Sequence, residues 1–145
     1  MLPNPGWRCL RPGIAEGPII GGNLNTMSGF LGTEYFPDVT GAILFIEDSL
    51  KGLSRIERSL SGLRLHGVFD RIAGLVLGKP ELLDREGAPF GLDELLLEVT
   101  EGYRFPILAG VDLGHTAPML TIPLGVRARL DASTGELTTL QSGVA

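Results

Sequence analysis

Apolar residues fall in short continuous runs through the middle of the chain. Residues 43–46, 72–77 and 106–111 are mostly aliphatic or aromatic, and each run is followed by glycine or by a polar residue. Short runs of this kind, rich in branched side chains, are typical of strands buried on both faces of a sheet. Residues 15–20 are a further candidate for a short strand. The pattern therefore predicts strands over these segments.

Between the runs, the apolar residues change to a helical spacing. Over residues 50–63, leucine or isoleucine recurs every three or four positions, with arginine and glutamate between them. This spacing predicts an amphipathic helix that covers a sheet and ends near Gly67. A second helix is predicted over residues 92–99, where two acidic residues in the first turn suit the helix dipole.

The last third of the chain favours an antiparallel arrangement. Short strands are predicted over residues 119–124, 126–130 and 136–140, and residues 131–135 have the composition of the turn between the last two. The order strand, helix, strand, helix, strand, followed by an all-β tail, predicts a mixed α/β fold. Its sheet would be small and partly parallel, with two main covering helices and an antiparallel C-terminal strand region.

The apolar residues near the N-terminus follow neither a strand-like nor a helix-like spacing. Residues 1–13 contain three prolines and two glycines, which predicts an irregular linker. We interpret it as the join to a preceding domain, with a frayed terminus as the alternative, and assign residues 14–145 to one domain. After the glycine turn at residues 21–22, a short helix is predicted up to Leu31, capped by Asn25, Thr26 or Ser28.

Composition narrows the class of protein. The 145 residues fit one domain of ordinary size, and a net charge of −5 without a basic run argues against nucleic acid and anionic membranes as partners. Cys9 is the single cysteine, so no internal disulfide forms and a reducing, cytoplasmic compartment is favoured. No apolar stretch approaches the roughly 20 residues of a membrane span, and no secretory signal is visible.

Polar residues follow the buried runs at the points where a parallel sheet would gather them. The run 43–46 leads directly into Glu47 and Asp48, and the run 106–111 leads through a glycine-containing turn into His115. Because the carboxyl ends of parallel strands share one edge, a carboxylate and an imidazole would meet there, and both side chains would be partly exposed. Such a pair can orient a histidine and let it act as a general base.

Structural readings of these residues are also open. Asp48 and Ser49 are suited to cap the following helix, which would leave Glu47 merely exposed. A lone histidine such as His115 is more often structural than catalytic. His66 lies at the end of the first long helix, where a cation suits the helix dipole, and is interpreted as a structural or surface residue.

Several stretches of the chain match, in the same order, the motifs of one known family. They are residues 21–24, Gly32-Thr33, residues 43–48, Arg58 with Leu60, residues 114–120 and residues 123–125, and they cover roughly residues 13–130. In these stretches the chain resembles the C-terminal domain of the LD-carboxypeptidase family of serine peptidases, including its microcin C self-immunity branch. The resemblance implies a two-domain enzyme with a Ser–Glu–His triad, in which Glu47 and His115 match the family's glutamate and histidine. It also implies a swivelling β/β/α domain.

In that family the serine lies in an N-terminal α/β domain, and no serine of this chain lies in a Gly-x-Ser-x-Gly elbow. The chain therefore offers two members of a triad, and its partner would be a separate nucleophile domain. The implied substrates are murein LD-peptides or peptidyl-nucleotide antibiotics, with no cofactor and no metal. A homodimer is compatible with this interpretation. The alternative is a non-catalytic binding or interaction domain.

Overall fold

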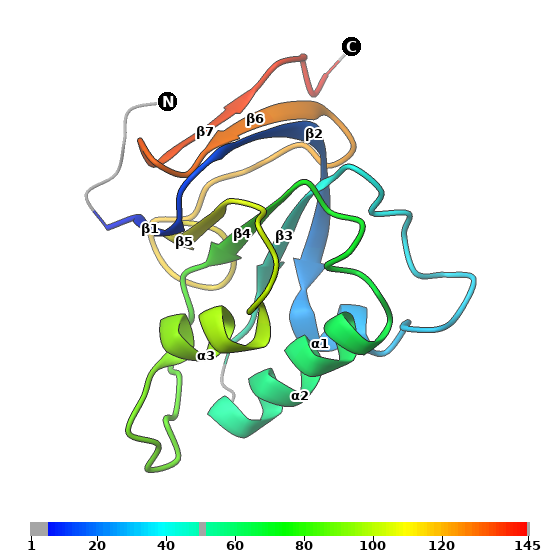
Figure 1. Cartoon of the computed structure of the whole chain (residues 1–145). Coiled ribbons are helices and arrows are strands. Elements are labelled where there is room, and N and C mark those ends of the chain that lie inside the picture. The colour runs from blue at the N-terminus through cyan, green and yellow to red at the C-terminus, as the bar shows by residue number, and fades with distance from the viewer. Residues whose placement is uncertain (1–5, 50–51, 145) are drawn as a thin grey trace.

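The computed structural model describes residues 6–49 and 52–144, and in this part of the chain seven strands form one curled sheet (Figure 1). The sheet order is β1-β5-β4-β3-β2-β6-β7. In chain order the elements are β1 (Arg8–Arg11), β2 (Ile14–Asn23), α1 (Leu24–Ser28), β3 (Ile43–Glu47), α2 (Leu53–Leu65), β4 (Gly74–Gly78), α3 (Leu92–Val99), β5 (Ile107–Val111), β6 (Arg127–Asp131) and β7 (Glu136–Thr139). The predicted mixed α/β class is confirmed.

The parallel centre of the sheet consists of β2, β3, β4 and β5. Every residue of β4 and β5 is buried, which explains why these strands appear in the sequence as unbroken apolar runs. Successive side chains of a strand point to opposite faces, so Leu44 and Ile46 of β3 pack on one side and Ile43 on the other. The three central apolar runs of the sequence are thus confirmed as neighbouring parallel strands.

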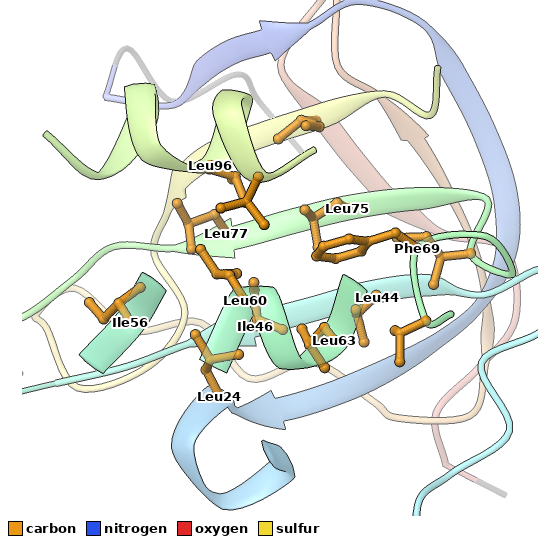
Figure 2. Packing of buried hydrophobic residues seen from close by; sticks show 14 of the residues in the cluster. Leu24, Leu44, Ile46, Ile56, Leu60, Leu63, Phe69, Leu75, Leu77 and Leu96 are labelled. Atoms are coloured by element: carbon orange, nitrogen blue, oxygen red, sulfur yellow. The ribbon is translucent and has the colours of Figure 1, made fainter. Parts of the chain in front are cut away.

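The helices cover one face of the sheet, and the larger hydrophobic core lies between the two layers (Figure 2). Leu60 and Leu63 of α2 and Leu96 of α3 are fully buried against strand residues such as Leu44 and Leu75. Burying an aliphatic side chain of this size contributes roughly 1.5 to 3 kcal/mol each. The apolar spacing predicted for the two long helices is therefore the face that holds them on the sheet.

The other face is covered by a β-hairpin. Strands β6 and β7 pair antiparallel and bury Ala128, Leu130 and Leu137 against the sheet. The ten-residue strand β2 connects the layers, because its first half pairs antiparallel with β6 and its second half pairs parallel with β3. The domain therefore has a helix layer, a parallel sheet and a hairpin layer, in agreement with the predicted β/β/α arrangement.

Three local predictions were wrong. Arg8–Arg11 is not irregular but forms β1, which pairs antiparallel with β5 at the edge of the sheet. Residues 119–124 form no strand. The cap of α1 is Asn23, whose Oδ1 accepts a hydrogen bond from the Thr26 backbone N–H at 3.0 Å, and not one of the three residues predicted. That residues 1–13 also join this domain to a preceding one stays a prediction.

The alternative in which Asp48 and Ser49 cap the following helix is also wrong. Helix α2 begins at Leu53, and its N-cap residue is Gly52. The carboxylate of Glu86, in the loop before α3, accepts from the backbone N–H of Ser54 at 2.7 Å. A carboxylate from a distant loop therefore satisfies the start of this helix, because the glycine at its cap has no side chain to do so.

No helix in the described part of the chain is long and apolar enough to cross a membrane.

Candidate functional site

The site begins with Glu47, the last residue of β3. The four apolar residues before it are held between β2 and β4, so the strand carries the glutamate out of the core at a fixed point. Its side chain is only 6% exposed. A buried carboxylate requires hydrogen-bond partners, because its desolvation costs several kcal/mol when nothing replaces water.

His115 reaches the same point from the other side of β4. Strand β5 ends at Val111, and a tight turn follows in which the Leu113 N–H donates to the Val111 carbonyl at 2.6 Å. The turn is fixed further by the Leu120 N–H, which donates to the Asp112 carbonyl at 2.7 Å. The imidazole of His115 leaves this turn with half of its side chain exposed to solvent.

Glu47 and His115 form a hydrogen-bonded pair, as the parallel topology predicted. His115 Nδ1 lies 2.8 Å from Glu47 Oε2, although 68 positions separate the two residues in the chain. One expectation was wrong: both side chains were expected to be partly exposed, and the carboxylate is buried. The pair thus combines a sheltered acid with an accessible imidazole.

Two glycines make room for the carboxylate. A Cβ atom at Gly114 would lie 2.6 Å from Glu47 Oε2, and a Cβ at Gly78 would lie 2.8 Å from the Cβ of Glu47. Gly114 also has a φ of +116°, a backbone conformation that favours glycine. Glycine is therefore required at both positions for Glu47 to approach His115 this closely.

The pair favours the protonated imidazole. The hydrogen bond to Glu47, followed by the charge of the same carboxylate, raises the pKa of His115 above its ordinary value of 6.5. Partial desolvation opposes this effect, while the more distant charges of Glu81 and Asp48 reinforce it. His115 therefore lies in an acidic environment that stabilises an imidazolium.

The chemistry that follows is orientation of a general base. A carboxylate accepts hydrogen bonds, so Glu47 fixes the neutral imidazole of His115 with its proton on Nδ1 and leaves the lone pair on Nε2. In that form Nε2 can accept a proton from a nucleophile and later return it. The buried carboxylate is placed to stabilise the imidazolium that such a proton transfer would produce.

Asp48 and His66, which the sequence also brought into consideration, are not hydrogen-bonded to this pair. The Oδ1 atom of Asp48 accepts from the backbone N–H of Ser49 at 2.9 Å, and its carboxylate acts on His115 only through its more distant charge. His66 lies at the C-terminal end of α2, where its Nδ1 lies 2.9 Å from the Gly62 carbonyl. Its interpretation as a structural residue agrees with this local contact.

The sequence reasoning missed Asn23 as a member of the site. Asn23 ends β2 and lies opposite Glu47 in the register of β2 and β3. Its side-chain Nδ2 donates to Glu47 Oε1 at 3.1 Å. The available signal was that Asn23 follows the isoleucines and glycines of one strand, as Glu47 follows the apolar residues of the next. That the two side chains are neighbours could be recognised only from the register of β2 and β3.

Among the residues that the structure describes, no serine hydroxyl forms a hydrogen bond with His115. The hydroxyl of Ser28 instead donates to the Leu24 carbonyl at 2.6 Å and lies 3.1 Å from the Ser59 hydroxyl. Nor do three or more His, Cys, Asp or Glu side chains gather as a metal site in the described ranges.

This fold and this pair define a partly parallel α/β domain that presents an acid-oriented histidine at the edge of its sheet. The family model of the LD-carboxypeptidase C-terminal domain matches residues 16–130. The chain therefore belongs to the LD-carboxypeptidase C-terminal domain family.

Individual relatives agree with this assignment. The chain is 49% identical over 120 residues to the microcin C7 self-immunity protein MccF of Escherichia coli, covering 82% of this chain and 35% of MccF. It is 47% identical over 126 residues to a Vibrio cholerae protein named "Putative carboxypeptidase", covering 86% of this chain and 38% of that protein. The chain thus spans little more than a third of the length of these curated relatives.

A solved structure of MccF in complex with glutamyl sulfamoyl guanosine has the same fold. The comparison gives a TM-score of 0.89 at 41% sequence identity, and it covers 96% of this chain and 42% of the MccF chain. The swivelling β/β/α-type domain expected from the sequence is therefore the fold that this chain shares with MccF.

Proposed function

We propose that this chain is the part of a serine carboxypeptidase that supplies the glutamate and the histidine of a Ser–Glu–His triad. The observation that carries the proposal is the 2.8 Å contact between His115 Nδ1 and the buried Oε2 of Glu47. Membership of the LD-carboxypeptidase C-terminal domain family supports the same reaction class. The reaction is hydrolysis of an amide bond.

In the proposed mechanism, a serine hydroxyl from a separate nucleophile domain attacks the scissile carbonyl while His115 Nε2 accepts the hydroxyl proton. The imidazolium then protonates the leaving amine, and the C–N bond breaks to leave an acyl-serine. The acyl-serine is then hydrolysed by the same steps, with water as the nucleophile. Nε2 takes a proton from water, the water oxygen adds to the acyl carbon, and the serine oxygen leaves as the imidazolium returns the proton to it. Glu47 accepts the hydrogen bond from Nδ1 throughout and holds the imidazole in the productive orientation.

The nucleophile domain is proposed to pack over the exposed segment that follows His115. Met119 and Leu124 leave 67% and 57% of their surfaces exposed there. Apolar side chains gathered beside a reactive histidine suit contact with another domain better than contact with water. Residues 1–13 are proposed to join the two domains.

The substrate class is proposed from the relatives. MccF has been crystallised with glutamyl sulfamoyl guanosine, and the chain is 41% identical to the MccF of that complex. We therefore propose the amide of a peptidyl- or aminoacyl-nucleotide as the substrate. Hydrolysis of murein LD-peptides instead would keep the triad and change only the specificity.

The test is amide hydrolysis by the complete protein that carries this chain, measured with an aminoacyl sulfamoyl nucleoside and with a murein LD-tetrapeptide. Glu47→Gln keeps the size of the side chain and removes its charge, so we expect kcat to fall by roughly 10³- to 10⁴-fold, by analogy with the orienting acid of other triads. Asp48→Asn is the matched control, since it removes the neighbouring buried carboxylate, and we expect a much smaller effect.

Two outcomes would overturn the assignment. If Asp48→Asn abolishes turnover and Glu47→Gln does not, the orienting acid is the neighbouring residue. If the folded complete protein hydrolyses neither substrate but binds one of them, the chain is part of a binding module. We also expect no turnover by the 145-residue chain alone, because a base without a nucleophile cannot form the acyl intermediate.

A further inference from the structure

Glu47 has two carboxylate oxygens, and the triad uses only one of them. Oε2 faces His115, while Oε1 receives the hydrogen bond from Asn23 Nδ2 at 3.1 Å. Because the side chain of Glu47 is only 6% exposed, water has little access to replace either partner. Among the residues that the structure describes, the oxygen that faces away from the histidine is thus held by one amide, that of Asn23.

The orientation of the Asn23 amide follows from its other contacts. Its Oδ1 atom accepts from the backbone N–H of Thr26 at 3.0 Å and from the Thr26 hydroxyl at 3.1 Å. A backbone N–H can only donate, so the atom facing it is the oxygen, and the atom facing Glu47 is the NH₂ group. Asn23 therefore caps α1 with one end of its amide and holds Glu47 with the other.

The surroundings of Glu47 leave few alternatives for its carboxylate. Asn23 bounds it from β2, Gly78 lies beside its Cβ from β4, and Gly114 lies beside Oε2 in the turn before His115. Among the described residues, the hydrogen bond from Asn23 is the side-chain contact that opposes rotation of the carboxylate away from His115, since the two glycines offer no side chain.

We propose that Asn23 is a positioning residue, which fixes the Glu47 carboxylate so that Oε2 stays on His115 Nδ1. This inference rests on the proposed function and adds to it the residue that orients Glu47. It also links two structural roles, because the cap of α1 locks the amide that holds the site. Without the Asn23 NH₂ group, the buried Oε1 loses this hydrogen bond, and the carboxylate becomes more stable if it turns toward water.

The two roles of Asn23 can be separated by substitution. Asn23→Ser keeps an oxygen that can cap α1, but it removes the NH₂ group that contacts Glu47. Asn23→Thr does the same and is suited to the end of a strand, so it replaces the serine variant if that variant does not fold. Asn25→Ser is the matched control, because it makes the same chemical change at an exposed position two residues along.

The first readout is the tautomer of neutral His115 in the 145-residue chain, measured from the ¹⁵N chemical shifts of the imidazole above its titration. We expect the Nδ1–H form in the unsubstituted chain and in Asn25→Ser. We expect Asn23→Ser to return toward the Nε2–H form, which free histidine prefers. A purely capping role would change the stability of α1 but leave this signature in place.

The second readout is turnover by the complete protein. We expect Asn23→Ser to lower kcat by about 10- to 100-fold with KM changed by less than about twofold, since a positioning residue acts on the reacting group. If the unsubstituted chain shows the Nδ1–H tautomer and Asn23→Ser keeps it, Asn23 is only a cap and the proposed function stands. If the unsubstituted chain itself lacks that tautomer, the Glu47–His115 pair fails and both proposals fall.

Discussion

The two histidines of this chain lie in regions that look alike locally. His66 follows the last turn of α2 and is followed by Gly67, while His115 follows Gly114 in the turn after β5. Each imidazole has its Nδ1 within hydrogen-bond distance of an oxygen, at 2.9 Å for His66 and 2.8 Å for His115. The local contact of the ring therefore does not distinguish them.

The partner of each histidine is different. His66 contacts the Gly62 carbonyl one helical turn earlier, a backbone group of its own helix. His115 contacts a buried carboxylate that arrives from β3, two strands away in the sheet. A backbone carbonyl has no net charge to stabilise an imidazolium, whereas a buried carboxylate does. A histidine becomes a candidate base through a charge brought from elsewhere in the fold.

The largest expected effect separates the two histidines by activity. In the complete protein, His115→Gln should lower kcat by a factor on the order of 10⁶, because loss of the base of a triad removes nearly all of its catalysis. His66→Gln should change kcat by less than about twofold, since its Nδ1 contacts the uncharged Gly62 carbonyl of its own helix. Steady-state kinetics of the two variants, with unfolding midpoints as a check on folding, make the comparison. Equal losses of kcat in the two variants would show that His115 has no special role in catalysis.

A smaller effect is expected from the glycines beside the two rings. Both have positive φ, but a Cβ at Gly67 would meet Asp70 at 3.5 Å, whereas a Cβ at Gly114 would lie 2.6 Å from Glu47 Oε2. We expect Gly67→Ala to lower the free energy of unfolding by about 1 kcal/mol. Gly114→Ala combines backbone strain with a close contact, and should cost roughly 2 to 4 kcal/mol. Urea unfolding of the 145-residue chain measures both, and a larger cost at Gly67 would contradict the crowding described around Glu47.

The smallest expected effect is a pH dependence of stability. The pKa of folded His115 is raised by Glu47, while the unfolded value is about 6.5, so the folded chain binds this proton more tightly. The contribution is therefore fully present below about pH 6.5 and is lost as the pH rises through the raised pKa. The difference in unfolding free energy between the unsubstituted chain and His115→Gln should shrink between pH 6 and pH 9. A difference that grows with pH would show that the pair destabilises the imidazolium.

The central sheet and its helices were predictable because their signals are local. Unbroken apolar runs predicted β3, β4 and β5, and helical spacing predicted α2 and α3. The contact between Glu47 and His115 followed from one further step, namely that parallel strands share the edge at which they end. Its 2.8 Å distance agrees with that step.

The missed features depend on partners distant in the sequence. Residues 8–11 have the composition of a linker, and they form a strand because the edge of β5 offers them hydrogen bonds. Residues 119–124 have the apolar content of a strand, yet they follow the turn of His115 and pair with no neighbouring strand. Asn23 was not recognised as a partner of Glu47, because the register of β2 and β3 cannot be read from either strand alone.

The division of β2 between two partners has a consequence for how the chain folds. Its second half can pair with β3 as soon as residue 47 is available, but Ile14 at its start pairs with Asp131. During synthesis the first half of β2 therefore has no strand partner until β6, near the end of this domain, has left the ribosome. We expect this half of the strand to form its hydrogen bonds last, and to be the edge at which newly made chains are most exposed to mispairing with one another.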